Sequence, residues 1–165
     1  MAAGGSPPLT SRLLAGAIAG MAGTIAMTAA MRRLHQRLPA GERYPLPPRE
    51  ITESILGGRS EEAVRDRSLA AHFAYGAASG ALLSAARPSA GPLEGAVAGV
   101  GIWAASYFGW VPAFGILRPA HDHPARRDML MIAVHVVWGA ATAVAAKELF
   151  RARPTMLGSG QIRDR

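Results

Sequence analysis

The sequence predicts an all-α, polytopic membrane protein with four transmembrane helices. Four stretches carry no charged residue, and they cover residues 13–31, 68–86, 95–117 and 129–146. At a rise of about 1.5 Å per residue, helices of this length cross the hydrocarbon core of a bilayer, which is roughly 30 Å thick. A soluble bundle would need a polar face on every helix. None of the four stretches has such a face.

The second observation is an internal repeat. Residues 72–79 and 135–142 share the pattern His-x-x-aromatic-Gly-Ala-Ala-hydroxyl. The apolar stretch before each copy contains Gly-Ala-x-Ala-Gly, at 16–20 and at 95–99. Chance similarity between Ala- and Gly-rich helices would explain the shorter pattern alone, but the histidine pattern is harder to obtain by chance. We therefore expect a duplicated helical pair.

We expect residues 1–150 to form a single four-helix transmembrane domain. Because odd and even helices cross in opposite directions, the halves 13–86 and 95–149 are predicted to be two parallel repeats, related by an axis along the membrane normal. Residues 151–165 are basic and contain Pro and Gly, so they are predicted to form a flexible tail.

The first apolar stretch resembles a signal peptide in one respect, since Arg12 precedes it and small residues end it. However, Arg32 and Arg33 follow at once, and the related stretch 95–117 lies where no signal peptide can be. Residues 13–31 are therefore predicted to be the first span.

A short interfacial helix is predicted in the connection between the first two spans. It covers Arg49 to Leu56, with its apolar residues on one side. Pro48 suits the first helical position, and Gly57 with Gly58 would end the helix. Its carboxylates would either reach the histidines or face solvent.

Charge indicates the orientation. The net charge is +7, and arginines gather in loops 32–67 and 118–128 beside the apolar spans. The positive-inside rule places these loops in the cytoplasm, although Lys147, Arg151 and Arg153 lie at the opposite end of the last helix. A basic charge without a recognition motif is weak evidence for nucleic-acid binding, so no nucleic-acid partner is expected.

Small residues at a spacing of four predict close helix packing. Lipid provides no hydrophobic drive for helices to associate, so contact depends on close backbone approach. The same surfaces would suit a homodimer or contact with another membrane protein. The predicted packing residues are Gly16, Gly20, Gly76, Gly80, Gly95, Gly99 and Gly139.

Two intramembrane histidines are the candidate site residues. His72 and His135 each share a helix face with small residues, so both rings should face protein. Paired imidazoles could ligate the iron of a b-type haem, or handle protons. With His121, His123 and Glu50 they could also hold a divalent metal. The alternatives are that each ring only fixes helix register, and that the short histidine loop is a solvated turn.

The chain resembles the YagU-like family of uncharacterised bacterial inner-membrane proteins. The resemblance implies a small multi-pass protein of the bacterial inner membrane and transfers no catalytic residues. It rests on Met27-Thr28, on 32–35 and 43–51, on Ser106-Tyr107 and Gly109-Trp110, on 123–127, and on 135–139.

These features favour a non-enzymatic membrane protein of a structural, accessory or membrane-stress type, with no cofactor. The alternative is a haem-binding, metal-binding or proton-handling protein that uses His72 and His135. An enzyme is not expected, because the sequence has no Ser-His-Asp order, phosphate loop or paired metal carboxylates on a helix. Without cysteine, a c-type haem motif and thiolate ligands are excluded.

Overall fold

The computed structural model describes residues 7–43, 45–57, 60–156 and 158. In this part of the chain the secondary structure is helical, without strands. Four of its helices are long and apolar enough to cross a membrane, which confirms the all-α polytopic prediction. They are Leu9–Gln36 (α1), Glu61–Ala86 (α3), the helix Pro92–Ala113 that begins with α4, and Ala125–Met156 (α6).

α1, α3 and α6 are longer than their uncharged stretches, because a backbone hydrogen-bond ladder does not stop at the first charged side chain. α3 begins at Glu61, outside the apolar stretch, and is capped by Ser60, whose hydroxyl accepts from the Ala63 N–H at 3.2 Å. Glu61 and Glu62 in the first turn also suit the positive end of the helix dipole.

The third span ends earlier than the predicted residue 117. α4 covers Pro92–Ala105, a wider π-helical segment (η2) covers Ser106–Trp110, and α5 covers Val111–Ala113. Gly109 has φ −109° and ψ −109°, outside the helical range. The chain then turns at Gly115, which has a φ of 67° that a residue without a side chain adopts most easily.

The predicted tail also begins later than expected, because α6 continues to Met156. Pro154 lies in its last turns, where a missing N–H removes only one hydrogen bond of the ladder. Glu148 and Arg151 form an ion pair at 3.0 Å on this extension. Residues 151–156 of the predicted tail are therefore helical, and most of the remainder lies outside the described residues.

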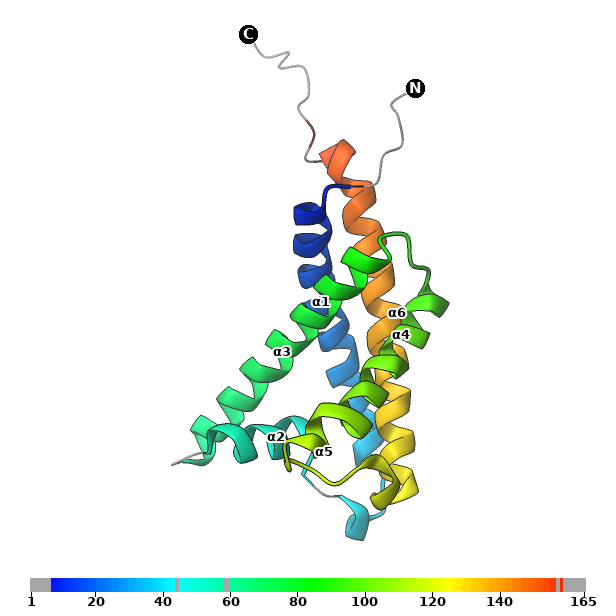
Figure 1. Cartoon of the computed structure of the whole chain (residues 1–165). Helices are drawn as coiled ribbons and strands as arrows, with labels where there is room; N and C mark the ends of the chain where they lie inside the picture. The colour runs from blue at the N-terminus through cyan, green and yellow to red at the C-terminus, as the bar shows by residue number, and fades with distance from the viewer. Residues whose placement is uncertain (1–6, 44, 58–59, 157, 159–165) are drawn as a thin grey trace.

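Figure 1 shows how the helices are arranged. The start of α1 and the end of α6 lie at one end of the molecule, and α2 and α5 lie at the other. α1 packs along both α3 and α6, and α4 packs along α6. α3 leans away from this group and touches α4 and α6 only briefly (Figure 1).

Glycines lie where the helix axes come closest. A Cβ on Gly20 of α1 would meet the carbonyl oxygen of Gly76 in α3, and one on Gly95 of α4 would meet that of Gly139 in α6. The other predicted packing glycines also face a neighbouring helix: Gly16 and Gly80 each face the other's carbonyl oxygen, Gly76 faces the Thr24 hydroxyl, and Gly99 faces the His135 carbonyl oxygen. Backbone therefore contacts backbone in both helix pairs, as expected where lipid supplies no hydrophobic drive.

The short helix α2 (Pro47–Leu56) lies across the end opposite the chain termini, between α3 and α5 (Figure 1). It begins two residues before the predicted Arg49, because Pro47 and Pro48 both fit its first turn. It ends at Gly57, with φ 59°. Gly58 and Tyr44, which belong to the predicted features of this loop, lie outside the described residues.

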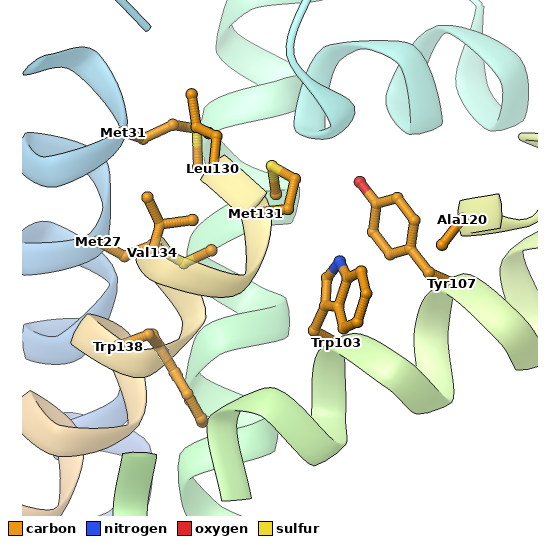
Figure 2. Close-up of a cluster of buried hydrophobic side chains, with 9 residues drawn as sticks. All are labelled: Met27, Met31, Trp103, Tyr107, Ala120, Leu130, Met131, Val134 and Trp138. Carbon is orange, nitrogen blue, oxygen red and sulfur yellow. The ribbon is translucent and has the colours of Figure 1, made fainter. Parts of the chain in front are cut away.

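The buried core joins α1, α4 and α6 (Figure 2). Trp103 stacks on Tyr107, with ring centroids 5.6 Å apart, and Trp138 of α6 is 3% exposed. Methionines fill the space beside these rings. The other members of the cluster are Met27, Met31, Ala120, Leu130, Met131 and Val134.

Candidate ligand-binding cavity

A cavity of about 250 Å³ lies beside this core, between α1, α2, α3, η2 and α6. Both candidate histidines line it, His72 from α3 and His135 from α6. It is larger than an engineered apolar cavity of roughly 150 Å³ that holds benzene. The space therefore suits a ring or a short hydrocarbon segment.

Burial distinguishes the floor of the cavity from its mouth. Thr24 and Met131, from α1 and α6, are 1% and 2% exposed and form the floor. Tyr75 of α3 is 42% exposed and Ile55 of α2 is 55% exposed, so they lie at the mouth. The cavity therefore opens between α3 and η2, next to α2.

His72 is held by Thr28 of α1. Its Nε2 lies 3.3 Å from the Thr28 hydroxyl oxygen. That hydroxyl donates its only hydrogen to the Thr24 carbonyl oxygen at 2.7 Å, so His72 Nε2 must be the donor. In the neutral ring, Nδ1 then keeps an unshared lone pair.

His135 has the opposite tautomer. Its Nδ1 lies 2.7 Å from the Met131 carbonyl oxygen, which can only accept, so Nδ1 carries the hydrogen. The lone pair of the neutral ring is therefore on Nε2. A histidine that donates its second nitrogen to a backbone carbonyl is oriented as metal-ligating histidines usually are.

A hydrogen bond crosses the mouth from α3 to η2. The Ser106 hydroxyl donates to the Ile102 carbonyl oxygen at 2.8 Å, so the Tyr75 hydroxyl, 2.8 Å away, donates to Ser106. Trp110 Nε1 also donates to the Ser106 hydroxyl oxygen, at 3.3 Å. Ser106 and Trp110 both lie in the π-helical segment η2. Such segments are frequent at functional sites.

A polar cluster anchors α2 at the end of the cavity. Arg127 of α6, with a side chain only 9% exposed, forms an ion pair with Glu50 of α2. On the other side, Arg49 Nη1 lies 2.6 Å from Glu61 Oε1 of α3. The hydrogen bonds of Arg49 to Glu61 and Glu53 raise its pKa. Figure 2 shows the Tyr107 hydroxyl pointing toward α2. The short helix is therefore held between α3 and α6.

His123 belongs to this cluster. Its Nδ1 lies 3.7 Å from Asp128, its ring packs edge-on against Tyr107 with centroids 5.9 Å apart, and its side chain is 9% exposed. Burial lowers the pKa of His123, and the nearby Arg127 lowers it further. The ring is therefore held in its neutral form.

The structure places two of the predicted metal residues, Glu50 and His123, in this cluster and leaves His121 outside it. Glu50 is paired with Arg127, while the exposed His121 stacks on Phe108 and lies 3.6 Å from Asp122. Among the described residues, no group of three His, Asp or Glu side chains is arranged to hold a metal ion. Glu53, the other carboxylate of α2, pairs with Arg49 and does not contact the histidines.

The difference between two helix contacts explains where the cavity forms. Gly23 of α1 lies against Trp138 and Thr142 of α6, so these two helices touch closely. If the halves are aligned on their glycine and histidine patterns, Ile102 of α4 takes the place of Gly23. The bulky side chain of Ile102 lines the cavity, and α4 stays apart from α3 there.

Several residues of the cavity and of the polar cluster beside it were not predicted from the sequence. Tyr75 is part of the repeat pattern but carries no predicted role, and Ser106 lies next to Tyr107 in an otherwise largely apolar span. Tyr107 and Arg127 lie within the motifs that resemble the YagU-like family. A search for polar residues inside the spans would have found the first three, whereas the burial of Arg127 depends on where α2 packs.

No protein-family model, curated protein or solved structure matches the chain. The fold and cavity therefore define the class of the protein by themselves: a multi-pass α-helical membrane protein with four candidate spans. The YagU-like resemblance stays a prediction.

Proposed function

We propose that this protein is a non-enzymatic membrane protein that binds a small, largely apolar organic molecule in the cavity beside His72 and His135. The observation that carries this proposal is the cavity of about 250 Å³, which is lined mostly by apolar side chains and also by both histidines. Apolar pockets with a few placed polar groups are typical of small-molecule sites.

The hydrogen bonding of the cavity supports binding over catalysis. The hydroxyls of Thr24 and Ser106 donate to carbonyl oxygens of their own helices, and His135 does the same through Nδ1. Because these hydroxyls donate their hydrogen to a carbonyl oxygen, neither forms the hydrogen bond to a base that activates a serine or threonine nucleophile. This favours an accessory role, such as binding or sensing a compound during membrane stress.

The setting that we propose is the bacterial inner membrane, with loops 32–67 and 118–128 in the cytoplasm. The arginine-rich composition of these loops supports this orientation. α2 and the polar cluster around Arg127 would then lie at the cytoplasmic surface. Contact with a second copy or with another membrane protein is part of the same proposal.

A second candidate is a b-type haem, a divalent metal or a proton carried at His72 and His135. It is favoured by the two unshared lone pairs, on His72 Nδ1 and His135 Nε2. The charge-free, largely apolar lining and the hydrogen bond that occupies His72 Nε2 make it the weaker candidate.

The test is to purify the protein in mild detergent and analyse what it carries, using an absorption spectrum, elemental analysis, and mass spectrometry of an organic extract. We expect a colourless, metal-free protein with a co-purifying organic molecule. Ala71→Phe places a ring at the mouth and should remove that molecule, whereas Ala70→Phe changes a neighbouring exposed alanine outside the cavity.

Two results would contradict the proposal. A Soret band or stoichiometric metal that is lost in both His72→Ala and His135→Ala would establish the second candidate. Identical extracts from wild type, Ala71→Phe and Ala70→Phe would show that the cavity retains no molecule during purification.

A further inference from the structure

The cavity carries information about the chemical class of its ligand, and this inference rests on the proposed function. The lining of the cavity indicates the charge of the ligand. No Asp, Glu, Lys or Arg lines the cavity among the described residues. A phosphate or carboxylate would lose its hydration there without gaining a counter-ion, which is strongly unfavourable. The ligand should therefore be neutral.

The hydrogen bonds of the cavity indicate which polar group the ligand carries. His72 and His135 have each used their N–H group, toward Thr28 and the Met131 carbonyl oxygen, and each keeps one acceptor nitrogen. Ser106 has likewise donated its hydrogen. These three side chains therefore offer acceptors, and the hydroxyls of Ser79 and Tyr107 also line the cavity. A ligand hydroxyl, which both donates and accepts, complements this set.

The position of the mouth indicates where the ligand enters. Tyr75 and Ala71 are exposed residues of α3 within a candidate membrane span, so their free surfaces face acyl chains. α3 and α4 touch only briefly, and the Tyr75–Ser106 hydrogen bond joins α3 to η2 across the mouth. A molecule dissolved in the bilayer would enter here after that one bond opens.

We propose that the cavity binds a neutral, hydroxyl-bearing amphiphile that enters from the bilayer between α3 and η2, with its hydroxyl on the imidazoles and its tail between α3 and α4. The volume of about 250 Å³ holds the head and the first carbons of such a molecule, and the remainder stays in lipid. Long-chain alcohols and phenols with an apolar tail belong to this class.

Tryptophan fluorescence provides the test, because Trp110 and Trp138 both line the cavity. The probes are a long-chain primary alcohol with two bromine atoms next to its hydroxyl end, its methyl ether, and the corresponding carboxylic acid. Bromine quenches tryptophan at short range. The ether keeps the shape but cannot donate, and the acid is anionic at pH 8.

We expect saturable quenching by the alcohol, about three- to tenfold tighter than by the ether, as for the loss of one hydrogen bond. The acid should bind more weakly still. His72→Phe combined with His135→Phe should remove the difference between alcohol and ether. Ala71→Phe should weaken both probes, and Ala70→Phe should leave both unchanged.

Each of the other outcomes overturns one part of the proposal. Equal affinity of wild type for alcohol and ether overturns the hydroxyl head group while leaving the cavity site intact. Tighter binding of the acid overturns neutrality. Unchanged binding in Ala71→Phe overturns the entry route. Quenching by neither probe, together with no co-purifying molecule, overturns the proposed function itself.

The rate of binding tests whether the Tyr75–Ser106 hydrogen bond limits entry of the ligand. Tyr75→Phe removes the hydrogen bond to Ser106 and keeps the ring. Stopped-flow quenching should show a higher association rate for alcohol and ether alike, with their affinity ratio unchanged. An unaltered association rate would show that the Tyr75–Ser106 bond does not limit entry.

Discussion

The two imidazoles of the cavity differ in which nitrogen carries the hydrogen, and this difference follows from their neighbours. Thr28 fixes His72 through Nε2, and the Met131 carbonyl oxygen fixes His135 through Nδ1. The repeat pattern gives both residues the same local sequence, yet Met131 lies in the helix of His135 and Thr28 lies in another helix. Individual contacts therefore decide the chemistry of each ring.

At the glycine contacts, one added carbon should change stability. Gly20→Ala would place a Cβ against the Gly76 carbonyl oxygen, which is backbone and cannot turn aside. We expect a loss of about 1–3 kcal/mol in the free energy of unfolding, measured by denaturation in detergent. Gly101→Ala is the matched control, because a Cβ there meets nothing within 4 Å. Equal effects of the two changes would contradict this packing.

His123 predicts a pH dependence. Its pKa lies below the usual value in the folded state, so the unfolded chain binds the proton more readily. The stability that it contributes is present above the unfolded pKa of about 6.5 and is lost as the pH falls toward the lowered folded pKa.

In His123→Gln, unfolding free energy should fall less between pH 7 and pH 5 than in wild type. His121→Gln is the control, since that ring is exposed. The same slope in wild type and in His123→Gln would contradict the assignment.

At the scale of elements, α2 is held by ion pairs to two different helices, Glu50–Arg127 to α6 and Arg49–Glu61 to α3. Breaking a buried pair by removing one partner costs about 3–5 kcal/mol, whereas exposed pairs contribute little. The side chain of Glu50 is 23% exposed, so its pair should fall at or below the lower end of that range. The Arg127 contact should therefore dominate the docking of α2.

Thr52 reports on this docking, because it is a buried residue of α2, only 3% exposed, and the chain has no cysteine. In a Thr52→Cys background, Arg127→Met should speed the reaction with a water-soluble thiol reagent by tenfold or more. Arg126→Met should change it little, because that arginine forms an exposed pair with Glu42. Combining Arg127→Met with Glu50→Leu should recover part of the protection, since no unpaired charge remains. No change in the rate with Arg127→Met would show that the pair does not hold α2.

At the scale of the whole molecule, the absence of cysteine also allows a clean test of orientation. Ala40 and Ser89 are exposed and lie in connections at opposite ends of the spans. In intact bacterial cells, a membrane-impermeant thiol reagent should label Ser89→Cys and should label Ala40→Cys only after lysis. The reverse pattern would invert the proposed orientation. Labelling of both in intact cells would contradict the four-span topology.

The sequence by itself determined the class of the protein, because four uncharged stretches of membrane length leave few alternatives to a helical bundle in lipid. It also contains, at a spacing of four, the glycines that lie between the helices. These features depend on local composition and spacing, which the chain carries directly.

Only the tertiary structure decided that His72 and His135 line one cavity, that Tyr75 reaches Ser106, and that Glu50 pairs with Arg127. Each of these depends on the distance between helices far apart in the chain. Gly23 lets α1 approach α6 closely, while Ile102 lines the gap between α4 and α3. That spacing results from the packing of all the helices together, so no single segment of the sequence specifies it.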